Sequence, residues 1–283
     1  MAYAEFGDFE PEFTSCEKSK IVILPVEYDH TSTWIKGSEK GPSALLEASK
    51  NLEFYDIETD SEVYKRGIYT DHPIRGFIRP EEMVQAVYDR VREHMADDKF
   101  CVCIGGEHSI SIGAMMAHCE KHPEATIVQF DAHSDLRDEY HGSEYNHACV
   151  MARGRELGPV VQIGIRSMDV EEKGSADFES IFLAKDIYNN TAWIDRMVSL
   201  LSENVYVTFD LDCLDVGIMP STGTPEPGGI GWYTALEALR AIAQNSNIVG
   251  MDISELCPNP VNKAPDFLAA KLLYKMITYK FEL

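Results

Sequence analysis

Short apolar runs rich in β-branched residues recur along the chain and constrain its fold more than any other feature of the sequence. They cover residues 21–25, 100–104, 126–130, 160–165, 181–184, 205–211 and 248–253. Such unbroken runs are typical of strands buried on both faces of a parallel sheet. Segments with helical apolar spacing separate them, at 43–50, 80–95, 109–121, 192–203, 234–244 and 265–279. The alternation predicts an α/β fold with three layers, α/β/α, around a central and mostly parallel sheet, in a single domain spanning residues 1–283.

Polar residues of the types used for catalysis or ligand binding follow several of these runs. They are Gly-Gly-Glu-His at 105–108, Asp-Ala-His-Ser-Asp at 131–135, Ile-Gly-Ile-Arg at 163–166, Asp-Leu-Asp at 210–212 and Ser-Glu-Leu at 254–256. In folds of this class, ligands bind beyond the carboxyl ends of the strands. We therefore expect these strand ends to converge on one rim of the sheet and to form the functional site there.

The acids in two of these strings indicate a metal centre. Residues two apart in extended backbone point to the same face, so each string directs its acids to one place. Like charge gathered at the end of an apolar strand is unfavourable unless a cation neutralises it. A lone Asp-x-Asp is most often a loop or a cap, but here several strand ends agree. The predicted metal ligands are His108, Asp131, His133, Asp135, Asp210 and Asp212.

This ligand set also predicts which metal binds and how many ions. Carboxylates and imidazoles without thiolate form a hard, oxygen-rich set that favours Mn²⁺ over a structural Zn²⁺. Four carboxylates would over-charge one dication but balance two, so the predicted cofactor is two Mn²⁺ per chain. Two such ions sharing a water can lower its pKa from ~15.7 towards ~7 and so provide hydroxide for hydrolysis.

Composition limits the possible partners. The chain has 47 acidic residues against 25 basic ones, a net charge of −22. This excess argues against nucleic acid and anionic membranes as partners and fits a cationic substrate or bound divalent cations. The N-terminus does not have the pattern of a signal peptide, and no apolar run approaches the ~20 residues of a membrane span. The irregularly spaced cysteines are interpreted as reduced thiols, so we expect a cytoplasmic protein.

Taken together, the motifs resemble those of the ureohydrolases, the family of arginases, agmatinases and their relatives. The resemblance rests on the strings at 105–109, 130–135, 209–212 and 222–225 and covers residues 20–280 in matching order and spacing. It implies an arginase/deacetylase-like fold, assembly as a homotrimer or homohexamer, and a binuclear manganese centre. By position, one ion is held by His108, Asp131, Asp135 and Asp210, and the other by Asp131, His133, Asp210 and Asp212.

The resemblance also implies roles for residues outside the metal ligands. His147 matches a histidine at the cleft mouth that shuttles protons, and Glu255 matches the acid that pairs with the guanidinium of the substrate. Thr224 lies in the turn that lines the substrate. The chemistry, apart from the resemblance, adds a role for the predicted ligand Asp212, which could accept a hydrogen bond from the bridging hydroxide and help pass its proton to the leaving nitrogen. Glu107 stands where many members have Asp, and we expect it only to adjust the turn.

The substrate is predicted from the loop at 136–147. It lacks the Ser/Thr/Asn-rich stretch with which arginases hold an amino-acid head, and its Asp138, Glu139 and Glu144 suit a cationic tail. The predicted reaction is hydrolysis of agmatine to putrescine and urea. Arg137 could instead pair with a carboxylate, and Asp169 stands where arginases hold the α-ammonium. Activity on arginine, guanidinobutyrate, guanidinopropionate or formiminoglutamate therefore stays open.

Two alternatives come from other functional classes. A single-zinc deacetylase of related fold would leave Asp135 and Asp212 without a role. A non-catalytic relative used for binding would typically have lost metal ligands, whereas this chain keeps the whole set. The number of metal ions bound per chain and the activity of the metal-loaded protein distinguish these alternatives from a ureohydrolase.

Overall fold

A nine-stranded parallel sheet forms the centre of the molecule in the computed structural model, which describes residues 4–283. Its strands are β1 (Ile21–Glu27), β2 (Ile68–Thr70), β3 (Ile74–Arg75), β4 (Phe100–Gly105), β5 (Thr126–Phe130), β6 (Val160–Ile165), β7 (Ile181–Leu183), β8 (Asn204–Asp210) and β9 (Asn247–Ser254). Every pairing between them is parallel. The predicted fold class is confirmed.

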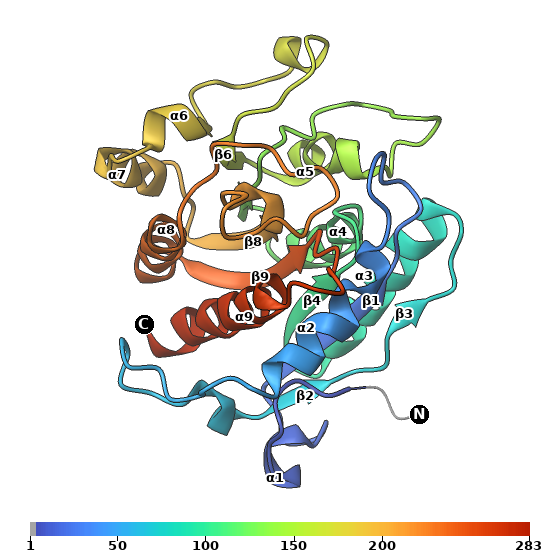
Figure 1. Ribbon diagram of the computed structural model, residues 1–283, viewed down its shortest axis with the longest axis vertical. Coiled ribbons are helices and arrows are strands. Elements are labelled where there is room, and N and C mark those ends of the chain that lie inside the picture. The colour runs from blue at the N-terminus through green and yellow to red at the C-terminus, as the bar shows by residue number, and fades with distance from the viewer. Residues whose placement is uncertain (1–3) are drawn as a thin grey trace.

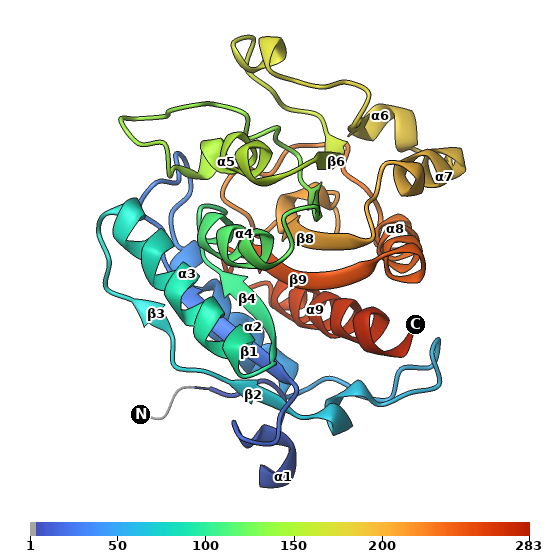
Figure 2. The same cartoon turned by 180° about the vertical axis from the view of Figure 1, so that it is seen from behind.

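Helices cover both faces of the sheet (Figures 1 and 2). The helices are α1 (Pro11–Thr14), α2 (Gly41–Ser49), α3 (Pro80–Ala96), α4 (Ile110–Lys121), α5 (Val150–Leu157), α6 (Ala184–Ile187), α7 (Ala192–Ser199), α8 (Trp232–Asn245) and α9 (Ala264–Glu282). Residues of α2, α7, α8 and α9 join one hydrophobic cluster, and those of α3, α4 and α5 join the other. Within residues 4–283, no helix has the length and apolar character needed to cross a membrane.

The strands explain the two clusters through their alternating side chains. In β1, Ile21 and Ile23 pack in the cluster that contains α9, whereas Leu24 and Val26 pack in the cluster that contains α3. All four side chains are fully buried. A strand covered on both sides has no polar face, which is why the sequence shows continuous apolar runs instead of alternation.

The structure differs from the sequence prediction mainly in short elements. Helix α7 ends at Ser199 and does not reach residue 203, because the Ser202 hydroxyl accepts a hydrogen bond from Thr126 N and donates one to Asn204 O, which shapes a turn into β8. The elements α1, β2, β3, α5 and α6 were not predicted. Each is too short to carry a clear period, or, in α5, lies among charged residues.

Strand order places the functional strings next to one another. The order across the sheet is β2-β1-β4-β9-β8-β5-β6-β7, with β3 also paired to β1. The chain passes from β4 to β5 and later inserts β8 and β9 between them. Neighbouring strands lie about 4.8 Å apart. The carboxyl ends of β4, β9, β8 and β5 therefore form one continuous stretch of rim, where the connections reverse direction.

One glycine allows the turn after β4 to lie against β1. Gly106 N donates to Val26 O and Glu107 N donates to Tyr28 O, both at 2.9 Å. A Cβ atom on Gly106 would lie 1.9 Å from the backbone oxygen of Tyr28. Only glycine permits this approach, which fixes where His108, two residues later, enters the rim.

We expect Gly106→Ala to destabilise the protein by about 2–3 kcal/mol or more, because the added methyl forces β1 and the β4 turn apart. Denaturant unfolding measures the change. Gly174→Ala is the matched control: a Cβ there meets no atom within 4 Å, so its unfolding midpoint should equal that of the wild type. Equal midpoints for the two variants would contradict this account of the turn.

Candidate metal centre

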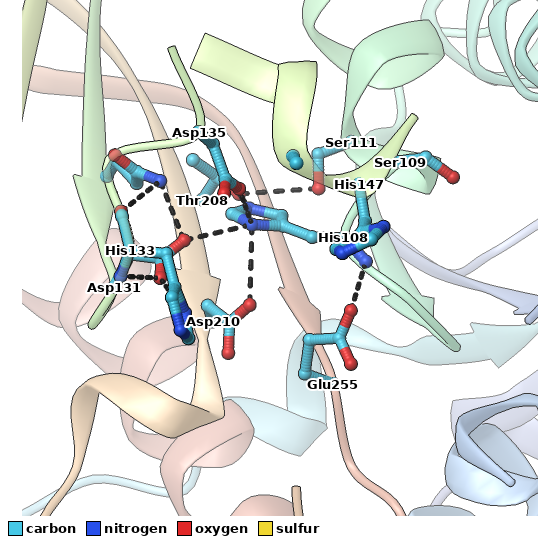
Figure 3. Close-up of polar contacts among 12 residues, drawn as sticks. His108, Ser109, Ser111, Asp131, His133, Asp135, His147, Thr208, Asp210 and Glu255 are labelled. Atoms are coloured by element: carbon cyan, nitrogen blue, oxygen red, sulfur yellow. Dashed lines mark hydrogen bonds and ion pairs between the residues drawn. The ribbon is translucent and has the colours of Figure 1, made fainter. Parts of the chain in front are cut away.

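Four adjacent strands deliver the candidate residues to one place. His108 follows β4, Asp131 follows β5, Asp210 ends β8 and Glu255 follows β9. All four side chains are buried. Figure 3 shows them pointing toward one another from the ends of their strands. The convergence predicted from the sequence is therefore present in the structure for four of the five strings. The side chain of Arg166, after β6, does not line the site and instead donates to the backbone oxygens of Asp212 and Glu226.

The first group of candidate ligands surrounds the ring of His108. Its Nδ1 lies 3.0 Å from Asp131 Oδ2, 3.1 Å from Asp135 Oδ2 and 3.4 Å from Asp210 Oδ2 (Figure 3). Three acids facing one ring nitrogen is an arrangement that requires a positive charge among them.

The second group is built on His133. Its Nδ1 lies 3.0 Å from Asp212 Oδ2 and 3.5 Å from Asp131 Oδ1. Asp131 thus turns one oxygen to each group, and it is the ligand common to both clusters found within residues 4–283. Asp210 was also predicted to bridge. The structure brings its Oδ2 to the first group, whereas its Oδ1 accepts from Asp212 N at 2.8 Å.

Burial and mutual repulsion shift the pKa values of these acids. The pKa of Asp135 is raised to about 7, first by burial and then by the charge of Asp131. Burial and the charges of Asp212 and Asp131 raise the pKa of Asp210 well above its usual range. Burial alone would lower the pKa of His133, but Asp212 and Asp131 raise it to about 12. A positive charge at either group would therefore be stabilised by the surrounding carboxylates.

Hydrogen bonds behind His108 leave its Nδ1 as a ligand atom. Thr208 Oγ1 lies 2.8 Å from His108 Nε2 and 2.8 Å from the buried carboxylate of Asp252, to which its hydroxyl donates. The hydroxyl has one proton, so it accepts from His108 Nε2–H. Nδ1 then presents a lone pair to the acids. Such support is typical of metal-bound histidines, and the residues present therefore fit a metal.

Two of the acids lie on strained backbone. Asp135 has φ 51° and Glu255 has φ 66°, in the left-handed region that residues other than glycine rarely adopt. Glu255 is held there by its N–H bond to Gly106 O at 2.7 Å. Strain of this kind persists where the surrounding structure fixes a side chain for function.

A cavity opens beside the two groups, and most of the predicted residues line it. They are His108, His133, Asp135, His147, Asp169, Asp210, Asp212, Thr224 and Glu255. Glu255 Oε1 accepts from His108 N at 2.7 Å. Its Oε2 has no hydrogen-bond partner within the part of the chain that the structure describes, so this oxygen can accept from a ligand.

His147 lies at the start of a short 3₁₀ helix, His147–Cys149, and is partly buried in the cavity wall. Its ring packs edge-on against Tyr140 with centroids 6.1 Å apart. Burial, with the nearby positive charge of His133 and His108, lowers its pKa to about 4. A pKa this low keeps the imidazole neutral at neutral pH, so one of its ring nitrogens has a lone pair that can accept a hydrogen bond from a ligand in the cavity.

Of the residues predicted to bind the substrate tail, some line the cavity and one does not. Asp169 lines the cavity, and its Oδ2 lies 3.0 Å from Arg137 Nη2. The Arg137 guanidinium also stacks over Tyr140, 4.6 Å from the ring centroid. Glu144 is not among the residues that line the cavity. It faces Arg153 at 3.4 Å instead, on an exposed part of the loop.

The sequence reasoning missed several residues around the site. Glu172, Tyr140 and Ser167 line the cavity, and Thr208 and Asp252 support His108. A sequence signal existed for Thr208, which lies two residues before Asp210 and therefore on the same strand face. None existed for Asp252, because its pairing with Thr208 depends on the register of β8 and β9.

Comparisons with known proteins agree on the family. The model of the arginase family matches residues 19–278. An N(1)-aminopropylagmatine ureohydrolase from Synechocystis sp. is 40% identical over 94% of this chain and 90% of its own length. An agmatinase from Pyrococcus horikoshii is 34% identical over 95% of each chain.

A solved structure is similar as well. The agmatine ureohydrolase of Thermoplasma volcanium superposes with a TM-score of 0.84 at 31% identity, covering 94% of this chain and 91% of its own. The family match spans nearly the whole chain and includes both groups of candidate ligands. This chain belongs to the arginase family, the ureohydrolases.

Proposed function

We propose that this ureohydrolase hydrolyses a guanidino compound with a cationic tail and releases urea, using two Mn²⁺ per chain. Agmatine is the first candidate substrate and N(1)-aminopropylagmatine the second. The observation that carries the proposal is the position of Asp131, which faces two His/Asp groups at once. Other members of both groups line a cavity together with Glu255.

The ligands divide between the two ions as the hydrogen-bond geometry suggests. His108, Asp131, Asp135 and Asp210 would hold one ion, and Asp131, His133 and Asp212 the other. The resemblance to the family implies Asp210 as a second bridge, whereas its Oδ1 accepts from Asp212 N in this structure. When bound, two such ions lower the pKa of a shared water towards ~7 and so make it nucleophilic at neutral pH.

Glu255 is suited to bind the reacting group of the substrate. One of its oxygens is fixed by His108 N, and the other faces the cavity. A guanidinium presents parallel N–H donors that match a carboxylate. Because His108 is a metal ligand and its backbone N–H holds Glu255, the guanidinium carbon would be placed next to the metal centre in a geometry close to that of attack.

The proton balance gives His147 and Asp212 their roles. Water adds its oxygen to the guanidinium carbon, the bond from that carbon to the tail nitrogen breaks, and both water protons end on the leaving amine. Urea and an alkylammonium are formed. Asp212, at the rim of the second group, accepts a proton from the attacking water, and His147 exchanges protons with the leaving amine and the solvent.

The ion pair of Arg137 supports a substrate with a cationic tail. Asp169 neutralises its guanidinium at 3.0 Å, so this arginine is not free to hold a substrate carboxylate. Glu139 adds negative charge to the same loop, whereas Asp138 and Glu144 face Arg153. The named relatives act on agmatine or on its aminopropyl derivative. An aminopropyl tail carries more positive charge than that of agmatine, which suits this surface equally well.

A panel of guanidines tests the proposal on Mn-loaded protein, with urea release as the readout. We expect kcat/KM for agmatine or N(1)-aminopropylagmatine to exceed that for arginine and for 4-guanidinobutyrate by about 100-fold or more, because a carboxylate tail meets an acidic loop. A preference for either carboxylate substrate would overturn the assignment. Deacetylase activity with one zinc per chain would favour the single-metal alternative.

Replacing the shared ligand should remove the metal. Asp131→Asn keeps the shape of the side chain but takes a negative charge from both groups, so we expect bound manganese to be lost and urea release to fall by more than about 100-fold. The matched control is His147→Ala, which should keep two ions per chain while kcat falls by about 100-fold. Metal analysis and steady-state kinetics measure both. Full metal content in Asp131→Asn would remove this residue from its bridging role.

Acid should release the metal before the protein unfolds. In the metal-free protein Asp135 has a pKa of about 7, so it is mostly ionised at pH 8 and protonated at pH 5. Because a protonated carboxyl does not bind metal, affinity for Mn²⁺ should fall by about tenfold per pH unit for each proton displaced as the pH drops below 7. Titration calorimetry at pH 8, 7 and 6, with circular dichroism as the folding control, tests this. Equal affinity at all three would contradict it.

A further inference from the structure

The loop after β1 is fastened to the turn after β4 by the side chain of Glu107. This carboxylate is fully buried. Its Oε2 accepts from the backbone N–H groups of Thr31 at 2.6 Å and Ser32 at 2.9 Å. Its Oε1 accepts from the hydroxyl of Ser109 at 2.6 Å and from that of Thr31. Burial raises the pKa of Glu107, and the hydrogen bonds from Ser109 and Thr31 oppose that rise because they stabilise the carboxylate.

Thr31 connects this carboxylate to His147. Its Oγ1 lies 2.5 Å from Glu107 Oε1, 3.0 Å from the backbone nitrogen of His147 and 3.2 Å from His147 Nδ1. The three residues come from segments far apart in sequence, and Thr31 Oγ1 is the atom on which they meet. Glu107 therefore does more than adjust its turn, which is all the sequence predicted for it.

The positions of the protons follow from counting donors and acceptors. The Thr31 hydroxyl has one proton and two lone pairs. Its proton goes to the carboxylate of Glu107, which is closer and a stronger acceptor than an imidazole nitrogen. Both lone pairs are then left for His147, one for its backbone N–H and one for a proton on Nδ1. This arrangement selects the tautomer of His147 with the proton on Nδ1 and the lone pair on Nε2.

We propose that Thr31, oriented by Glu107, is a positioning residue that holds His147 in the Nδ1–H tautomer and presents its Nε2 as the atom that exchanges protons in the cavity. The inference rests on the role of His147 in the proposed function. It is consistent with the geometry in both proton states, because Nδ1–H donates to Thr31 whether or not Nε2 carries a proton. The ring can then take up and release a proton without rotating.

The test compares variants of Thr31 in the Mn-loaded protein. Thr31→Val keeps the shape of the side chain but removes the hydroxyl, and we expect kcat to fall by about tenfold with KM and metal content unchanged. Thr31→Ser restores a hydroxyl and should recover kcat to within about twofold of the wild type. In the His147→Ala background, Thr31→Val should cause no further loss, because it acts only through His147.

Thr278→Val is the matched control for the loss of a buried threonine hydroxyl, because Thr278 donates to Tyr274 O within α9 and lies outside the site; its kcat should match that of the wild type. If Thr31→Val keeps wild-type kcat while His147→Ala loses activity, the inference is wrong and the proposed function stands. An equal further loss in the His147→Ala background, or a loss of bound metal, would show a merely structural role and also overturn it. If His147→Ala is fully active, His147 does not shuttle protons and the inference is wrong. Urea release by the wild type then still tests the proposed reaction.

Discussion

The repulsion among buried acids at the ends of β5 and β8 is the constraint on which the rest of this structure depends. Asp131, Asp135, Asp210 and Asp212 lie close together in a buried rim, and burial with mutual charge raises the pKa values of Asp135 and Asp210. Such a cluster is tolerated only with positive charge among its members. The ring nitrogens of the two histidines mark where that charge belongs, and the hydrogen bond from His108 to Thr208 leaves Nδ1 to meet a cation.

The order of the strands in the sheet brings the members of this cluster together. Inserting β8 and β9 between β4 and β5 places four functional strand ends side by side, each fixed by a ladder that is buried on both faces. Binding and proton transfer are then set by the connections around the rim. Glu255 is held by His108 N in the turn after β4, and His147 is held by Thr31 in the loop after β1, so hydrogen bonds to neighbouring connections fix both side chains.

Much of the fold and the convergence of the candidate ligands were predictable, because both depend on local patterns. Continuous apolar runs identify buried parallel strands, and acids two residues apart must share a face. Short elements such as β2 and β3 could not be predicted, since two or three residues carry no period. The pairing of Arg137 with Asp169, and the turn of Glu144 toward Arg153, depend on loop conformation, which the sequence pattern does not encode.

The amino-acid sequence by itself determined the fold class, the rim that carries the chemistry and the identity of the candidate ligands. Strand periodicity and the chemistry of the side chains are local properties of the chain, so they can be inferred without knowing the tertiary structure. Only the tertiary structure decided that Asp131 faces both groups, that Asp252 acts through Thr208 on His108, and that Glu107 acts through Thr31 on His147. Hydrogen bonds join residues up to 116 positions apart in these contacts, and their geometry exists only once the strands are paired.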